Sequence, residues 1–269
     1  MGKFDKKVVL IAGCKGAADE IAKIICAEGG TVIVNDPDKA LTDAITAPVA
    51  EKLNFGISME ESHKLIEYLT GKCHTDDNTK QMVRDSEGKY PALNAVIFNY
   101  DDYNSCKMRA DQITVEAYKK AMDINVNSLF HLGGALREQF KWQGEKGQQS
   151  TILLMTSVVG LAGLTQLASL YAAAKGAVNG LVRCIAKEYG RFANVNGLAQ
   201  GFYADSKIGI GPKDRAKGDY LITSTARSKE DLTAKDVAKM AAFLASDDAH
   251  MISGQIVTVD GGLWTRVQA

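Results

Sequence analysis

Three side chains in the second half of the chain have the types and spacing needed to move a proton on and off an alcohol. Tyr171 and Lys175 are four residues apart, so on a helix they share one face. Ser157 lies 14 residues before Tyr171. A free tyrosine titrates near pH ~10, and a neighbouring ammonium favours the phenolate and lowers that pKa. We therefore expect Tyr171 to exchange a proton with a carbinol oxygen that Ser157 holds.

The predicted elements around these residues favour this interpretation over an ordinary surface helix that happens to carry Tyr and Lys. The apolar run Thr151–Met155 predicts a buried strand that ends at Ser157. A helical pattern then extends from about Ser169 to Tyr189. A serine at the end of such a strand can point to the same place as a tyrosine in the next helix.

The first part of the chain has the pattern of a nucleotide-binding unit. Lys7–Ala12 and Thr31–Asn35 predict strands, and Ala18–Glu28 predicts the helix between them. This unit suits a dinucleotide, whose pyrophosphate would meet the helix N-terminus. Leu93–Phe98 and Val195–Gly201 predict further buried strands. We expect a single α/β domain: a doubly wound, Rossmann-like fold with about seven parallel strands flanked by helices.

Composition limits the function classes. The 269 residues carry 32 Lys plus Arg and 32 Asp plus Glu, so a net charge of zero argues against nucleic acid or a membrane surface as partner. Five cysteines without a C-x-x-C pair indicate a reducing compartment, and we expect a cytoplasmic protein. The cysteines and four histidines show no metal-site spacing, and the charged start predicts no signal peptide.

Two segments carry a resemblance to a known family. The stretch from Ser157 to Lys175 and the C-terminal segment Ile252–Gly262 resemble the short-chain dehydrogenase/reductase family. The resemblance extends from Lys7 to Gly262, and the family's serine-to-tyrosine spacing is one residue shorter than here. It implies a nucleotide half (about 1–110), a catalytic half (about 111–269) and a substrate lid (about 202–231).

The resemblance also assigns roles and partners. Its catalytic set is Asn125, Ser157, Tyr171 and Lys175, and Lys175 also contacts the cofactor. The family's helix asparagine, matched by Asn125, holds a water that links the lysine to solvent; a buried polar residue that satisfies a kinked backbone is the alternative. The helix after Tyr171 and the long helical region Val115–Trp142 form the family's dimer interface. We therefore expect a homo- or hetero-oligomer, a dimer or tetramer.

The family's glycine pattern, T-G-x-x-x-G-x-G, is altered here. Gly13 and Gly16 match its first two glycines if one residue of the turn is missing, and Ala18 takes the third place. Asp19 adds a carboxylate to the first helical turn, where it would repel a pyrophosphate by about 3 kcal/mol at ~5 Å. A solvated first-turn acid is the alternative.

Two residues indicate opposite cofactors. Asp36 lies where an acid binds the ribose 2′-hydroxyl and rejects a 2′-phosphate, which favours NAD. Lys15 stands where the family's NADP enzymes carry a basic residue. We give Asp36 more weight because it opposes the phosphate directly, so NADP is the less favoured cofactor. A simple pair between Lys15 and Asp36 is the alternative that needs no cofactor.

Further departures lie on the cofactor side. The family ends the Leu93–Phe98 strand with Asn-Asn-Ala-Gly, and this chain keeps Asn99 but follows it with Tyr100 and Asp101. We expect these two side chains to bring bulk and charge near the adenosine side, although an ordinary turn explains them too. The other departures are His74, Gln200 and Asp205.

These observations lead to two hypotheses. The proton-transfer set is complete while the cofactor set departs at several places, which favours a subunit with a weakened or blocked dinucleotide site. Such a subunit would support an active paralogue in a hetero-oligomeric secondary-alcohol dehydrogenase, with a hydroxyacyl-CoA as one candidate substrate. It is similar in kind to the non-catalytic subunit of the heteromeric dehydrogenase that oxidises hydroxybenzylsuccinyl-CoA in anaerobic toluene breakdown. The alternative is an active NAD-dependent alcohol dehydrogenase or ketone reductase.

Overall fold

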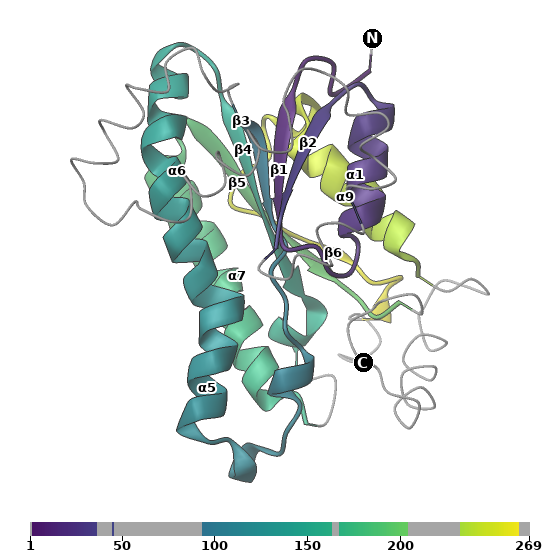
Figure 1. Cartoon of the computed structure of the whole chain (residues 1–269), viewed down its shortest axis with the longest axis vertical. Coiled ribbons are helices and arrows are strands. Elements are labelled where there is room, and N and C mark those ends of the chain that lie inside the picture. The colour runs from purple at the N-terminus through teal and green to yellow at the C-terminus, as the bar shows by residue number, and fades with distance from the viewer. Residues whose placement is uncertain (1, 37–44, 46–92, 163–166, 204–231, 264–269) are drawn as a thin grey trace.

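Six parallel strands form one sheet between two layers of helices (Figure 1). The computed structural model describes residues 2–36, 45, 93–162, 167–203 and 232–263. Across the sheet the order is β2-β1-β3-β4-β5-β6. The strands are β1 Val8–Ala12, β2 Thr31–Asn35, β3 Leu93–Phe98, β4 Ser150–Ser157, β5 Ala193–Gln200 and β6 Ile256–Val259.

This topology confirms the doubly wound, Rossmann-like α/β fold. The chain moves outward from β1 to β2 and then returns to place β3 on the other side of β1, so the strand order reverses between β1 and β3. Ligands of such sheets bind at the carboxyl ends of the strands beside this reversal. The resemblance also implies a third strand along the chain, ending near Cys73; this strand, needed to reach the expected number of about seven, lies outside the described residues.

Helices cover both faces of the sheet. Residues alternate between the faces along β1: Val9 and Ile11 belong to the apolar cluster shared with α1 and α9, whereas Val8 and Leu10 belong to the cluster shared with α6 and α7. Burial on both sides explains the continuous apolar strands. None of the described helices combines the length and apolar character needed to cross a membrane. The helices are α1 Ala18–Ala27, α5 Val115–Met122, α6 Ser128–Glu145, α7 Ser169–Tyr189 and α9 Ala234–Ala245.

Helix α1 packs one apolar face on the sheet. Ile21, Ala22 and Ile25 are buried and Ile24 is partly buried, while the match of Gly13 and Gly16 to the family's glycines stays a prediction. Burial of each isoleucine contributes roughly 1.5–3 kcal/mol. The helix ends where Gly29 adopts a φ of +87°, which glycine allows without strain.

The long helix expected at Val115–Trp142 is divided. One π-helical turn, Asp123–Asn127, separates α5 from α6, and α6 continues to Glu145. Ser128 Oγ donates to the Ile124 carbonyl oxygen at 2.7 Å within this irregular stretch. Single π-turns of this kind occur often at functional sites.

Candidate active site

The catalytic candidates meet at the carboxyl end of the sheet. Ser157 is the last residue of β4, and Tyr171 and Lys175 lie in the first two turns of α7. Helix α7 packs closely against the turn that follows β4 because Gly160 in that turn has no side chain. A Cβ at Gly160 would lie 2.7 Å from the carbonyl carbon of Lys175. Thr156 Oγ1 also donates to the Lys175 carbonyl oxygen at 3.2 Å. Tight packing of α7 therefore positions both residues.

The exit of β3 brings a fourth group to this place. The Tyr171 hydroxyl donates to Asp101 Oδ2 at 2.8 Å. Lys175 Nζ lies 3.5 Å from the same oxygen and donates to the Tyr100 carbonyl oxygen at 3.2 Å. Asp101, Tyr171 and Lys175 are 5%, 3% and 1% exposed, so the network is buried. The other carboxylate oxygen, Asp101 Oδ1, is buried with no hydrogen-bond partner within the described part of the chain.

This geometry corrects two expectations. Burial and the negative charge of Asp101 raise the Tyr171 pKa well above its usual value, so the expectation that Lys175 lowers it is wrong. Ser157, whose Oγ accepts from the Val159 N–H at 3.2 Å, acts in the opposite direction on the Tyr171 pKa but does not outweigh these two causes. The expected position of Asp101 at the adenosine side was also wrong, because its carboxylate faces Tyr171 and Lys175, the catalytic pair. The acid was visible in the sequence, but its direction depends on a contact across 70 residues.

Asn125 lies in the π-turn and ties it to the β3 exit. Its Nδ2 donates to the Ala121 carbonyl oxygen at 3.0 Å, and its Oδ1 accepts from the Asp102 N–H at 3.3 Å. These contacts match the alternative in which a buried amide satisfies an irregular backbone. The water-holding role stays a prediction.

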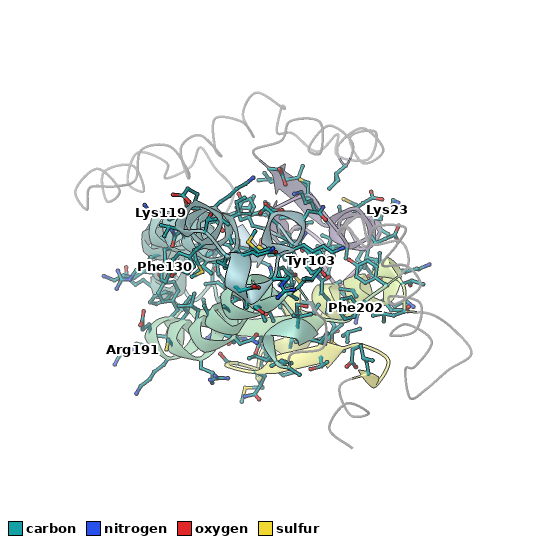
Figure 2. All side chains as sticks on the ribbon, turned by 90° about the horizontal axis from the view of Figure 1, so that it is seen from below. Lys23, Tyr103, Lys119, Phe130, Arg191 and Phe202 are labelled. Carbon is teal, nitrogen blue, oxygen red and sulfur yellow. The ribbon has the colours of Figure 1, made fainter. Side chains whose placement is uncertain are left out.

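An apolar wall surrounds the tyrosine. Tyr103 packs edge-on against Tyr171, with ring centroids 5.1 Å apart, and Phe202 packs against the same cluster. Tyr103 lies near the middle of the molecule when it is seen from below (Figure 2). Cys106 is buried here, and its Sγ donates to the Asp102 carbonyl oxygen. Burial, followed by the charge of Asp102, raises the Cys106 pKa to about 11, so this thiol is not a nucleophile near neutral pH.

The glycine turn packs directly on the β3 exit. Gly13 and Gly16 adopt φ values of +100° and +62°, which explains why both are glycine. A Cβ at Gly13 would lie 2.5 Å from the Asn99 carbonyl carbon. The Asn99 side chain donates to the carbonyl oxygens of Gly13 (2.9 Å) and Lys15 (2.7 Å). Asn99 therefore holds the turn itself.

Asp36 also forms a hydrogen bond to the glycine turn. Its Oδ2 accepts from the Cys14 N–H at 2.8 Å. Burial raises the pKa of the Tyr100 phenol, and the negative charge of Asp36 raises it further. Asp36 directly follows β2, and the expectation that Tyr100 brings bulk near the adenosine side stays a prediction.

The remaining predicted residues are only partly described. Asp19 accepts from Lys23 Nζ at 2.7 Å on the first turns of α1, as expected for an ordinary first-turn acid. Gln200 is buried and accepts from the Tyr203 hydroxyl at 3.4 Å. His74, Asp205 and most of the expected lid lie outside the described residues.

The contacts test whether a dinucleotide fits these residues. The family resemblance assigns Asp36 and Lys175 to the cofactor, and a pyrophosphate would require backbone donors of the turn. Here Asp36 bonds the turn amide of Cys14, and Lys175 bonds Tyr100 and Asp101. In this arrangement polar atoms that the resemblance assigns to the cofactor are already bonded within the chain, and no reaction step is assigned to a dinucleotide.

Comparisons with known proteins agree with the fold. A family model described as enoyl-(acyl carrier protein) reductase matches residues 11–264. The chain is 27% identical to a 3beta-hydroxysteroid dehydrogenase of Mediterraneibacter gnavus, over 98% of this chain and 97% of that protein. It is 28% identical to a 3-oxoacyl-(acyl-carrier-protein) reductase of Haemophilus influenzae, over 88% and 99%.

Solved structures show the same architecture. A gluconate 5-dehydrogenase from Burkholderia cenocepacia, in complex with NADP and tartrate, matches with a TM-score of 0.77 at 20% identity, covering 97% of this chain and 96% of that one. A 3-ketoacyl-(acyl-carrier-protein) reductase from Brucella melitensis, complexed with NADH, matches with a TM-score of 0.74 at 23% identity, covering 97% and 99%.

Proposed function

Because the chain belongs to the short-chain dehydrogenase/reductase family of oxidoreductases, we propose that it is a subunit with a weakened dinucleotide site that supports an active paralogue. The assembly would be a hetero-oligomeric secondary-alcohol dehydrogenase. One observation carries this proposal: the Tyr171 hydroxyl donates to the Asp101 carboxylate at 2.8 Å. A tyrosine that accepts a proton from an alcohol must first lose its own. Burial and the charge of Asp101 hold the Tyr171 pKa well above its usual value, which opposes the loss of that proton.

The proposed partner would contact the helices that form subunit interfaces in the family. Val115, Tyr118 and Phe130 on α5 and α6 are 63%, 49% and 55% exposed. Phe130 lies on the side of the molecule formed by these helices, away from Lys23 on α1 (Figure 2). On α7, a Cβ added to Gly180 would meet no atom within 4 Å. Exposed large apolar side chains beside such an open helix surface suit contact with a second subunit.

The substrate class is part of the same proposal. A secondary alcohol, with a hydroxyacyl-CoA as one form, would react in the paralogue. This role is similar in kind to the non-catalytic subunit of the hydroxybenzylsuccinyl-CoA dehydrogenase.

Titration of the purified lone chain with NADH and NADPH, followed by cofactor fluorescence, tests the proposal. We expect weak binding of NADH, no better binding of NADPH, and no turnover of secondary alcohols. The chain purified from its native cells should carry a second family member. Tight NADH binding by the lone chain would refute the weakened site. A stable monomer in light scattering at micromolar concentration would contradict the assembly.

An active NAD-dependent alcohol dehydrogenase or ketone reductase is the second candidate function. Two observations favour it: Ser157, Tyr171 and Lys175 lie together at the strand ends, and relatives of the chain are named as dehydrogenases and reductases. If the lone chain oxidises a secondary alcohol, Tyr171→Phe should remove nearly all of that activity without unfolding the protein. Unchanged turnover in that variant would exclude the phenol from the mechanism.

A further inference from the structure

Two consecutive residues that follow β3, Tyr100 and Asp101, bond the polar atoms of Tyr171 and Lys175. The Tyr100 carbonyl oxygen and the Asp101 carboxylate are both within reach of Lys175 Nζ, at 3.2 Å and 3.5 Å. Asp101 Oδ2 also accepts the Tyr171 hydroxyl. A lysine that is 1% exposed requires a counter-charge, because an unpaired ammonium is costly to bury. Asp101 supplies that charge from within the chain.

The segment that carries Asp101 is fixed on both sides. Before it, the Asn99 N–H donates to the Ala12 carbonyl oxygen at 2.6 Å, and the Asn99 side chain bonds the glycine turn. After it, the Asp102 N–H donates to Asn125, and Asp102 Oδ1 accepts from the Ser105 N–H at 3.1 Å. With its neighbours held in this way, the backbone of Asp101 is fixed next to Tyr171 and Lys175.

We propose that Asp101 is an internal ligand, whose carboxylate occupies the place against Tyr171 and Lys175 that a reacting oxygen and cofactor hydroxyls would otherwise take. The Tyr171 hydroxyl and the Lys175 ammonium therefore have partners in the folded chain without a dinucleotide. The Tyr100 side chain, which packs partly buried against the apolar cluster that includes β3, would add a second obstruction. This inference rests on the proposed function, since it identifies what weakens the site.

The test uses the full chain and measures binding and stability together. Asp101→Gly, alone and with Tyr100→Ala, should tighten NADH binding at least about a hundredfold over the unmodified chain in a fluorescence titration. NADH should raise the melting temperature of these variants but not that of the unmodified chain. Asp111→Gly is the matched control, because this acid lies in the same part of the chain but is exposed and pairs with Arg109. It should leave NADH binding unchanged.

The outcomes separate this inference from the proposed function. If the unmodified chain binds NADH weakly and a folded Asp101→Gly binds it equally weakly, the internal ligand is refuted and the weakened subunit stands. If the unmodified chain already binds NADH tightly, the proposed function fails. Should Asp101→Gly not fold, Asp101→Asn keeps the size of the side chain and removes only its charge. That variant must melt well below Asp111→Asn; equal melting temperatures would overturn the inference.

Discussion

Removing one member of the buried pair between Asp101 and Lys175 should cost an unusual amount of stability. The Lys175 ammonium and the Asp101 carboxylate are 3.5 Å apart, and their side chains are 1% and 3% exposed, respectively. At an effective dielectric of about 20, two unit charges at this distance attract by about 5 kcal/mol. A single substitution leaves the other charge buried and unpaired. We expect Asp101→Asn and Lys175→Met each to lower the free energy of unfolding by roughly 3–5 kcal/mol.

The double variant, Asp101→Asn with Lys175→Met, decides whether the loss of stability in the single variants arises from an unpaired charge. With both changes no ion remains buried, so its loss should be far smaller than the sum of the single losses. Urea unfolding followed by circular dichroism measures all three, with unchanged m values as the check on the transition. Lys239→Met is the control: its pair with Asp236 is shorter, 3.3 Å, but the side chains are 61% and 43% exposed, so it should cost less than about 1 kcal/mol. Single losses no larger than this control, adding up in the double variant, would refute the buried charge pair.

Three further predictions concern groups of known environment. The folded-state pKa of Tyr171 is raised, so its contribution to the free energy of unfolding is present below pH ~10 and is lost as the pH rises further. Urea unfolding at pH ~8 and at pH ~10.5 should therefore show the unmodified chain losing stability relative to Tyr171→Phe. Thr233 caps α9 in a reciprocal pair with Asp236, so Thr233→Ala should cost about 1 kcal/mol in urea unfolding, and no loss would contradict the cap. At pH 8 a thiol-alkylating reagent should modify exposed Cys184, but not buried Cys106 with its pKa of about 11, until the protein is denatured; peptide mapping distinguishes the two.

Most of the described fold could be predicted from the sequence because local patterns determine it. The β2 and β3 strands begin and end where the β-branched and apolar runs do, at Thr31–Asn35 and Leu93–Phe98. Helix α7 likewise spans the predicted Ser169–Tyr189. Burial of the strands on both faces produces continuous apolar runs, which are strong signals. A kinked backbone at Asn125 was one alternative, but the π-turn at Asp123–Asn127 was not predicted, because the residue types there are compatible with an uninterrupted helix.

By itself the sequence determined which residues come together at the carboxyl end of the sheet. Local periodicity predicted the strand that ends at Ser157 and the helix on which Tyr171 and Lys175 share a face. The glycines marked the turn after β1. It also marked Asp101 as unusual. Only the tertiary structure decided what that acid does, because the contact joins β3 to α7 across 70 residues. The pKa of a buried phenol depends on the charges that surround it in three dimensions, and here the nearest one is negative.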